Sequence, residues 1–327
     1  MKKFMNSPST LVADGLDGFT AAHSDIVELA PSRKFVRRRS GSRSKVVLIS
    51  GGGSGHEPLH VGFVGLGMLD AACPGQIFSS PTPDQIVEAA DELAGEAGAL
   101  LIVKNYSGDR MNFEMAAESV SCRIATVLVD DDVSDTATNH GMGRRGVAGT
   151  LVVEKMLGAA AEMGADLETC LVLGAKVKAR TRTIGVALSY CSLPTVGVRS
   201  FSLGADEMEL GVGIHGEPGR RKVKFDIADV IADELVTMIA SDLGNPKSGD
   251  ALLLINGFGG TPLMELYVMY NSARRLLEQR GVRIVRSLVG NFVTSLDMVG
   301  CSVTVCLLDL EMARLWDSPV RTAALNW

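Results

Sequence analysis

One histidine, His215, stands in a run rich in glycine: Gly211, Val212, Gly213, Ile214, His215, Gly216, Glu217, Pro218 and Gly219. These glycines leave room for a small electrophile to approach the imidazole. A neutral imidazole nitrogen can attack a ketone carbonyl and form a hemiaminal, if a donor stabilises the developing alkoxide. Glu209 and Glu217 flank the ring and could fix its tautomer. On these residues alone, His215 could equally be an ordinary loop residue.

A second histidine, His56, follows an apolar run at 46–49 and the glycines Gly51, Gly52, Gly53 and Gly55. Glycines let backbone N–H groups approach an oxygen-rich ligand, as in phosphate-binding loops. Neither a G-K-[ST] ending nor the G-x-G-x-x-G spacing is present, so the pattern disfavours nucleotide binding. We expect a strand, a loop and a helix opened by Pro58, with His56 at a strand end where ligands bind. The alternative is a tight turn with an incidental histidine.

A second apolar run, residues 99–103, is followed by Lys104, Asn105, Tyr106, Ser107, Gly108 and Asp109. Lys104 could neutralise an oxygen or orient a carbonyl group. Asp109 could accept a proton from a substrate hydroxyl, which is the general-base task in phosphoryl transfer. The competing interpretation is that Asp109 caps a helix over residues 110–122.

Two charged clusters are predicted to be solvated loops. The acidic run Asp130, Asp131, Asp132 and Asp135 lacks a histidine or a second acidic group that would complete a metal site. We therefore predict no metal site. A basic patch over residues 33–45 precedes the first apolar run, and it could instead contact an acidic partner.

Composition limits the function classes. The 327 residues are 46% hydrophobic and 21% charged and carry a net charge of -6, which is typical of a soluble globular protein and disfavours binding to nucleic acid or anionic membranes. The six cysteines form no C-x-x-C pair, so we expect reduced thiols in a cytoplasmic protein. No apolar stretch approaches the ~18 residues of a membrane span, and no targeting segment is apparent.

Apolar runs of strand type alternate with helical patterns, which predicts an α/β fold with mainly parallel sheets and helices on their faces. Further strands are expected at 125–129, 251–255, 282–285 and 303–308. Helices are expected at 145–164 and at 261–280, the latter with Thr261 as N-cap and Pro262 as its first residue. The helical pattern from Leu167 ends near 185–194, which suggests two α/β domains, residues 1–187 and 188–327.

Several longer motifs together resemble one known family. They are GGGSGHEP from Gly51, CPGQIFSSPTPDQI from Cys73, KNYSGDRMNF from Lys104, GRRGVAGT from Gly143, EMELGVGIHGEPG from Glu207, TSLDMVG from Thr294 and LWDSPVRTAALNW from Leu315. In this order they resemble the dihydroxyacetone-binding (K) subunit of dihydroxyacetone kinases, and the resemblance covers essentially the entire chain.

The resemblance implies roles for named residues. His215 would hold the ketone as a covalent hemiaminal, His56 would assist as acid or base, and Asp109 would activate the accepting hydroxyl. Gly53 and Lys104 would contact the ketose, and Ser80 is a further substrate-binding residue.

The resemblance also implies partners. The family is usually dimeric, and its nucleotide, ATP or ADP with Mg²⁺, is held by a separate L-type subunit, so we expect no cofactor on this chain and activity only with a partner. The acidic run at Asp130 favours a phosphotransferase-system phosphocarrier over free ATP as the ultimate donor.

Other functions stay open. A ketose-sensing co-regulator on the same fold would keep the covalent histidine but act through a transcription factor, and a plain sugar-binding protein would not need it. Retention of His56 and Asp109 favours the enzyme. The substrate could be dihydroxyacetone or a tetrulose such as erythrulose, which differ by one hydroxymethyl group.

Overall fold

The computed structural model describes residues 2–134, 143–194, 202–217 and 219–327. These residues form two compact units, each assembled from separate stretches of the chain. Unit 1 comprises Met1–Val129, Val153–Lys176 and Arg314–Trp327, and unit 2 comprises Asp130–Val152 and Val177–Ala313. The division into contiguous domains, 1–187 and 188–327, stays a prediction. No helix in the described ranges is long and apolar enough to cross a membrane.

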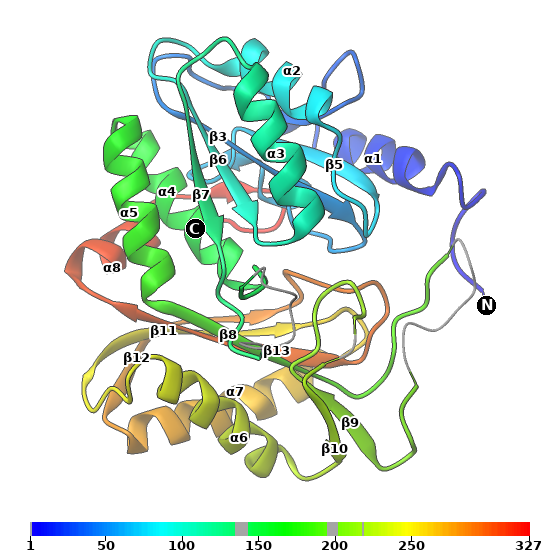
Figure 1. Cartoon of the computed structure of the whole chain (residues 1–327), viewed down its shortest axis with the longest axis vertical. Helices are drawn as coiled ribbons and strands as arrows, with labels where there is room; N and C mark the ends of the chain where they lie inside the picture. The colour runs from blue at the N-terminus through cyan, green and yellow to red at the C-terminus, as the bar shows by residue number, and fades with distance from the viewer. Residues whose placement is uncertain (1, 135–142, 195–201, 218) are drawn as a thin grey trace. The chain divides into compact units, whose positions relative to one another are not determined.

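Unit 1 is built on a mixed sheet in the order β1-β2-β5-β3-β6-β7 (Figure 1). Its strands are β1 Val27–Leu29, β2 Val36–Arg38, β3 Val47–Ser54, β5 Ala71–Ile77, β6 Ala99–Lys104 and β7 Ile124–Val129. Strands β5, β3, β6 and β7 pair in parallel, whereas β1 and β2 pair antiparallel at one edge. The central strands β3 and β6 are buried on both faces, as continuous apolar runs predict.

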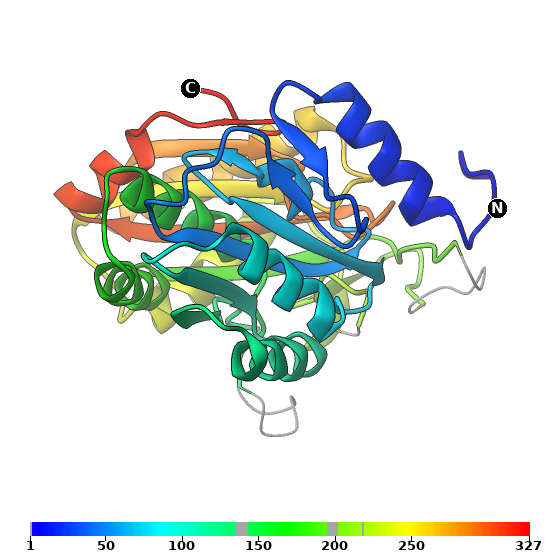
Figure 2. The same cartoon turned by 90° about the horizontal axis from the view of Figure 1, so that it is seen from above.

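Helices cover this sheet. Helices α2 Pro83–Leu93 and α3 Ser107–Ser119 lie side by side against it (Figure 1), and Ile86 and Phe113 enter the core that they share with the strands. Helix α1 Leu11–Ala22 lies beside β1 (Figure 2). A small sheet of β4 Gly65–Leu66 and β14 Arg321–Thr322 joins distant parts of the sequence.

Three helices contain residues of both units: α4 Gly149–Glu162, α5 Leu167–Ala179 and α8 Leu310–Asp317. Within unit 1, the glycines of α4 and α5 permit close packing. A Cβ on Gly158 would come within 2.4 Å of the Met68 Cα, and one on Gly174 within 2.6 Å of the Val127 side chain.

Unit 2 contains a second mixed sheet in the order β10-β9-β8-β13-β11-β12 (Figure 1). Its strands are β8 Thr181–Ala187, β9 Glu207–Leu210, β10 Arg221–Lys224, β11 Gly249–Gly257, β12 Val282–Gly290 and β13 Gly300–Leu308. Strands β11 and β12 pair in parallel, and the other neighbours pair antiparallel. Helices α6 Ala228–Asp242 and α7 Leu263–Gln279 lie together against the sheet and share its apolar core. The α/β prediction is therefore confirmed, but the second sheet is mostly antiparallel and not mainly parallel as expected.

Two element boundaries differ from the prediction. The helical pattern that begins at Leu167 ends at Ala179, and β8 occupies residues 181–187, which the sequence did not distinguish from the end of that pattern. Helix α7 has Pro262, not Thr261, as its N-cap residue. The hydroxyl of Thr261 donates instead to Gly300 O at 2.6 Å, which ties the start of α7 to β13.

The basic patch is not the solvated loop that we predicted. Arg38 and Lys45 are only 8% exposed at their side chains, and both pair with the buried carboxylate of Asp70 and with Glu162. Further contacts of the patch include Arg33 with Asp17, Lys34 with Asp84 and Glu88, and Arg37 with Glu28 and Glu92. The patch thus joins β2 and the start of β3 to neighbouring elements of unit 1.

Candidate active site

The glycine run lies inside a strand. Gly51, Gly52 and Gly53 belong to β3, and the predicted helix after Pro58 is absent: the next helical turn is a short 3₁₀ turn at Val61–Phe63. Only glycine fits at two of these positions, because neighbouring backbone atoms come close to them. A Cβ on Gly51 would lie 2.5 Å from Cys73 O, and one on Gly53 would lie 2.6 Å from Ser79 N. The run brings the backbone of β3 against β5 and the segment that follows it.

Lys104 and Asp109 form a buried ion pair at the end of β6. The Lys104 side chain is 0% exposed, and its Nζ lies 3.1 Å from Asp109 Oδ2. Asp109 lies in the first turn of α3, whose N-cap residue is Tyr106, so the competing interpretation that Asp109 caps the helix is wrong. The Ser80 hydroxyl donates to the other oxygen, Asp109 Oδ1. The structure therefore joins Ser80, Asp109 and Lys104 directly.

His56 follows the end of β3 and is buried in unit 1. Its ring is 1% exposed and stacks on Phe78, with 5.0 Å between ring centroids and 14° between planes. Phe78 is also the residue whose backbone lies against Gly53. Five predicted site residues, Gly53, His56, Ser80, Lys104 and Asp109, thus belong to unit 1.

A further buried pair lies beside Lys104 and was missed by the sequence analysis. His60 Nε2 lies 3.0 Å from Lys104 Nζ, and His60 Nδ1 lies 2.6 Å from Glu154 Oε1. Burial, followed by the charges of Lys104 and His56, lowers the pKa of His60 well below its usual value. Burial raises the pKa of Glu154 to about 8, against the opposing charge of Lys104. The available sequence signal was Glu154 itself, a carboxylate that directly follows the apolar run Leu151, Val152 and Val153.

His215 belongs to unit 2, where Glu217 faces its ring. The Glu217 Oε1 lies 3.5 Å from His215 Nδ1, and Oε2 accepts the His215 backbone N–H at 2.8 Å. Burial alone would raise the pKa of Glu217, but the hydrogen bond and charge of His215, with the charge of Arg145, lower it to about 2. Glu209 accepts instead from Gly219 N. Of the two flanking carboxylates, Glu217 is therefore the one that can fix the His215 tautomer.

Arg145 supports this loop. Its guanidinium contacts Asp132 Oδ2 at 2.8 Å, donates to Ser134 Oγ at 2.7 Å and to Gly211 O at 2.6 Å, and lies 3.8 Å from Glu217. Arg145 links the acidic run to the two ends of the glycine-rich segment around His215.

The acidic run is accordingly not the solvated loop that we predicted. Asp132 is 2% exposed and Asp131 is 1% exposed. Asp131 accepts the backbone N–H groups of Val147 and Gly149, and burial raises its pKa to about 6. Asp130 pairs with Lys178, and Asp135 lies outside the described residues. Within the described ranges, no group of three His, Cys, Asp or Glu side chains could hold a metal ion.

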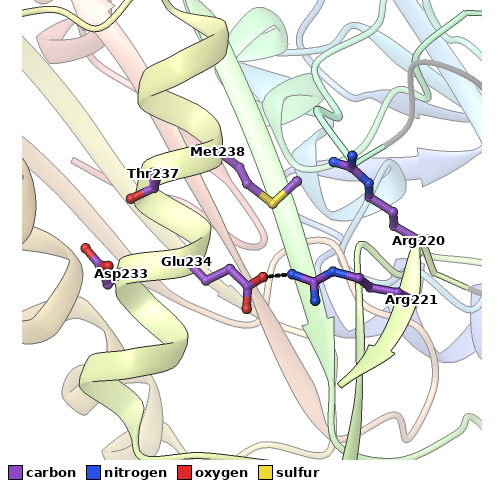
Figure 3. Close-up of a pocket in the computed structure, with 6 residues that line it drawn as sticks. All are labelled: Arg220, Arg221, Asp233, Glu234, Thr237 and Met238. Atoms are coloured by element: carbon purple, nitrogen blue, oxygen red, sulfur yellow. Dashed lines mark hydrogen bonds and ion pairs between the residues drawn. The ribbon is translucent and has the colours of Figure 1, made fainter. Parts of the chain in front are cut away.

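A groove in unit 2 follows the His215 loop in sequence, between β10 and α6 (Figure 3). Its volume is about 410 Å³, and Arg221 pairs with Glu234 across it. The lining residues are Arg220, Arg221, Asp233, Glu234, Thr237 and Met238. None of them is a predicted site residue, so we do not place a substrate there.

Comparison with known proteins identifies the family. The Dak1 domain model matches residues 17–324. The chain is 46% identical to "PTS-dependent dihydroxyacetone kinase 1, dihydroxyacetone-binding subunit DhaK" of Listeria innocua, over 99% of this chain and 100% of the relative. It is 42% identical to the PEP-dependent dihydroxyacetone kinase subunit DhaK of Escherichia coli, over 100% of this chain and 99% of the relative.

Solved structures of the same family have a similar fold. The dihydroxyacetone kinase operon co-activator DhaQ matches with a TM-score of 0.90 and 35% identity, over 95% of this chain and 96% of that one. The dihydroxyacetone kinase of C. freundii also matches with a TM-score of 0.90, at 36% identity, over 98% of this chain and 60% of that one. The chain therefore belongs to the Dak1 family, among the dihydroxyacetone-binding K subunits of dihydroxyacetone kinases.

Proposed function

We propose that this chain is the substrate-binding subunit of a short-ketose kinase, that it holds the ketone as a hemiaminal on His215, and that a partner subunit supplies the phosphoryl group. The observation that carries the proposal is the family match over essentially the whole chain, at 46% identity to a dihydroxyacetone-binding subunit. The motifs of that family fall on residues whose surroundings suit the proposed chemistry.

Capture of the ketone begins at His215. Because Nδ1 faces Glu217, Nε2 is the nitrogen proposed to attack. A bond forms between Nε2 and the carbonyl carbon, the carbonyl oxygen gains a proton, and Nδ1 loses one, so the hemiaminal forms without net proton change. The Glu217 carboxylate stabilises the positive charge that the ring carries during the attack. A polyol has no carbonyl carbon and is rejected at this step.

Phosphorylation then requires an activated hydroxyl. Asp109 is proposed to accept the hydroxyl proton as its oxygen attacks phosphorus, which is the general-base role in phosphoryl transfer. The Lys104 Nζ lies 3.1 Å from one oxygen of this carboxylate, and the Ser80 hydroxyl donates to the other. His56 is proposed to assist as acid or base, and Gly53 to bind the ketose.

The phosphoryl donor is proposed to reside on an L-type partner that carries ATP or ADP with Mg²⁺. The Listeria relative is named PTS-dependent and the Escherichia one PEP-dependent, which favours a phosphotransferase-system phosphocarrier as the ultimate source. A kinase structure of C. freundii contains AMP-PNP and Mg²⁺, and 60% of that longer chain matches this one. We further propose a homodimer in the cytoplasm, and dihydroxyacetone or a tetrulose as substrate.

The test is phosphoryl transfer to dihydroxyacetone with an L-type subunit, supplied either with ATP or with the phosphotransferase components. We expect turnover with one donor system, and a loss of about 100-fold or more in kcat for Asp109→Asn, as for loss of a general base. Turnover with neither donor, or an Asp109→Asn variant as active as wild type, would contradict the kinase.

A ketose-sensing co-regulator is the second candidate, because the co-activator DhaQ shares the fold with a TM-score of 0.90. A sensor needs ketone capture at His215 but no general base. Capture without turnover under every donor condition, together with ketone-dependent binding to a transcription factor, would favour this candidate over the kinase.

A further inference from the structure

The buried pair of His60 and Glu154, which contacts Lys104 through His60 Nε2, has no role in the proposed chemistry. We propose that His60 is a positioning residue: its Nε2 fixes the ammonium group of Lys104, and through it the carboxylate of Asp109, while Glu154 holds His60 in the required tautomer. The inference rests on the proposed function, since it assigns a task to residues that support the general base.

The contacts of Lys104 leave it no freedom. Its ammonium group has three N–H donors. Three acceptors surround Nζ: Gly51 O at 3.2 Å, His60 Nε2 at 3.0 Å and Asp109 Oδ2 at 3.1 Å. With each donor assigned, removal of one acceptor would let the ammonium group turn and would change its geometry toward Asp109.

This arrangement determines the tautomer of His60. Because the ammonium group can only donate, Nε2 must accept, and the ring proton of the neutral imidazole must lie on Nδ1. Glu154 Oε1 lies 2.6 Å from Nδ1, and Ser50 Oγ lies 3.1 Å from it. The Ser50 hydroxyl donates to Ile102 O at 2.7 Å, so its oxygen can also accept from Nδ1. Each neighbour thus offers an oxygen that can accept the Nδ1 proton, which is compatible with the Nδ1–H form that the contact with Lys104 requires.

The electrostatics agree with a neutral ring. Burial and the neighbouring Lys104 charge lower the pKa of His60, so a second cation does not form beside the ammonium group. The side chains of Lys104 and Glu154 are both fully buried. Within the part of the chain that the structure describes, the second oxygen of Glu154, Oε2, has no hydrogen-bond partner. Such a group is costly to bury, which argues against Glu154 being mere scaffold.

Strand β3 is shaped to allow this contact. A Cβ on Gly52 would overlap Lys104 Nζ and come within 3.3 Å of His60 Nε2. The absence of a side chain at Gly52 thus opens the space in which the ammonium group and the imidazole meet.

The first readout is independent of activity. In ¹⁵N-histidine NMR of the full chain, with the His60 signals assigned by their loss in His60→Gln, we expect a protonated Nδ1 and an unprotonated Nε2. In Lys104→Met, which removes the donor to Nε2, we expect the Nε2–H form to become populated. A protonated Nε2 in wild type would overturn the proposal.

The second readout is turnover with the L-type partner. We expect His60→Leu, which removes one of the three acceptors of Lys104, to lower kcat by about 100-fold, as a small displacement of a catalytic group can. His60→Gln, whose amide oxygen can accept from Lys104, should recover most of the loss. His23→Leu, a change of the half-buried histidine beside Phe19 in the same unit, should leave kcat unchanged. Ketone capture at His215 should persist in all three variants.

The outcomes separate this proposal from the proposed function. If wild type captures no ketone, the proposed function fails, whereas the NMR result on His60 is unaffected. If a folded His60→Leu variant turns over as wild type does, or if His60→Gln is as slow as His60→Leu, positioning by His60 is refuted. If His60→Leu does not fold, the kcat of His60→Gln and the tautomer of His60 in wild type still test positioning by His60.

Discussion

The buried pair of Lys104 and Asp109 makes a quantitative prediction about stability. Their side chains are 0% and 4% exposed, and the charged atoms lie 3.1 Å apart. Breaking such a pair from one side leaves a buried charge uncompensated, which costs about 3–5 kcal/mol. Removing both charges avoids that cost. We therefore expect Lys104→Met and Asp109→Asn each to destabilise strongly, and the double variant to be about 2–3 kcal/mol more stable than the sum of the two effects.

Urea unfolding followed by tryptophan fluorescence measures this coupling energy, because the fluorescence reports on unit 1, which contains the ion pair. The chain has two tryptophans, Trp316 and Trp327, and both belong to unit 1, as the pair does. Their rings are 5.6 Å apart, and Trp316 is 4% exposed, so unfolding of unit 1 should change the emission.

A matched control is available in the same unit. Arg33 and Asp17 also form an ion pair, but their side chains are 53% and 55% exposed. A cycle of Arg33→Met and Asp17→Asn should give a coupling of about 1 kcal/mol or less. The reasoning is refuted if the Lys104 and Asp109 effects simply add, or if the exposed pair couples as strongly as the buried one.

Three further predictions concern other parts of the molecule. In Gly53→Ala the new Cβ would lie 2.6 Å from Ser79 N and 2.7 Å from Phe78 Cα, so ketone affinity should fall by about tenfold or more. The control Gly15→Ala has open space around its Cβ and should bind the ketone as wild type does. Equal affinities in the two variants would contradict the assignment of Gly53. The pKa of Glu217 is lowered from 4.5 to about 2, so its contribution to stability is present above pH 4.5 and is lost as pH falls towards 2. The stability difference between wild type and Glu217→Gln, from urea unfolding followed by circular dichroism, should shrink over that range, and a constant difference would contradict the low pKa. Among the six thiols, Cys122 is half-buried and the others are buried, and burial raises the pKa of Cys301 and Cys306 to about 12. One thiol should therefore react quickly with Ellman's reagent. Two or more fast thiols would be inconsistent with this burial.

The sequence predicted those strands whose residues form a continuous apolar run. The runs at 99–103 and 251–255 are continuous and apolar, and they form the interior strands β6 and β11. The polar segment after β6 could be anticipated because ligands bind at strand ends. Strand β8 was missed because it follows α5 after one residue, so no turn signal separates the two elements.

Long-range contacts explain what the sequence could not show. Gly51 to Gly53 resemble a loop by composition, yet strand β5 approaches them closely and keeps them extended. Arg38 and Lys45 belong to a run of basic residues, and only the fold brings Asp70 to them. In the same way, Glu154 lies 94 residues from His60, so no local pattern could reveal their contact.

The prediction of residue roles depended more on the family resemblance than on the spacing of the residues. By themselves, the glycines around His215 left an ordinary loop residue as an alternative, and Asp109 could have been a helix cap. The structure excludes the cap, because Asp109 lies within the first turn of α3 and contacts Lys104. The structure also selects Glu217 over Glu209 as the neighbour of His215 Nδ1.

Covalent capture of the ketone is the central claim, and intact-protein mass spectrometry tests it most directly. Wild type and His215→Ala are incubated with dihydroxyacetone, erythrulose or glycerol, trapped with borohydride and weighed. We expect an adduct of ketone size on wild type only, with either ketone and never with glycerol, and the more extensive adduct would indicate the preferred substrate. No adduct on wild type, or an equal adduct on His215→Ala, would contradict covalent capture.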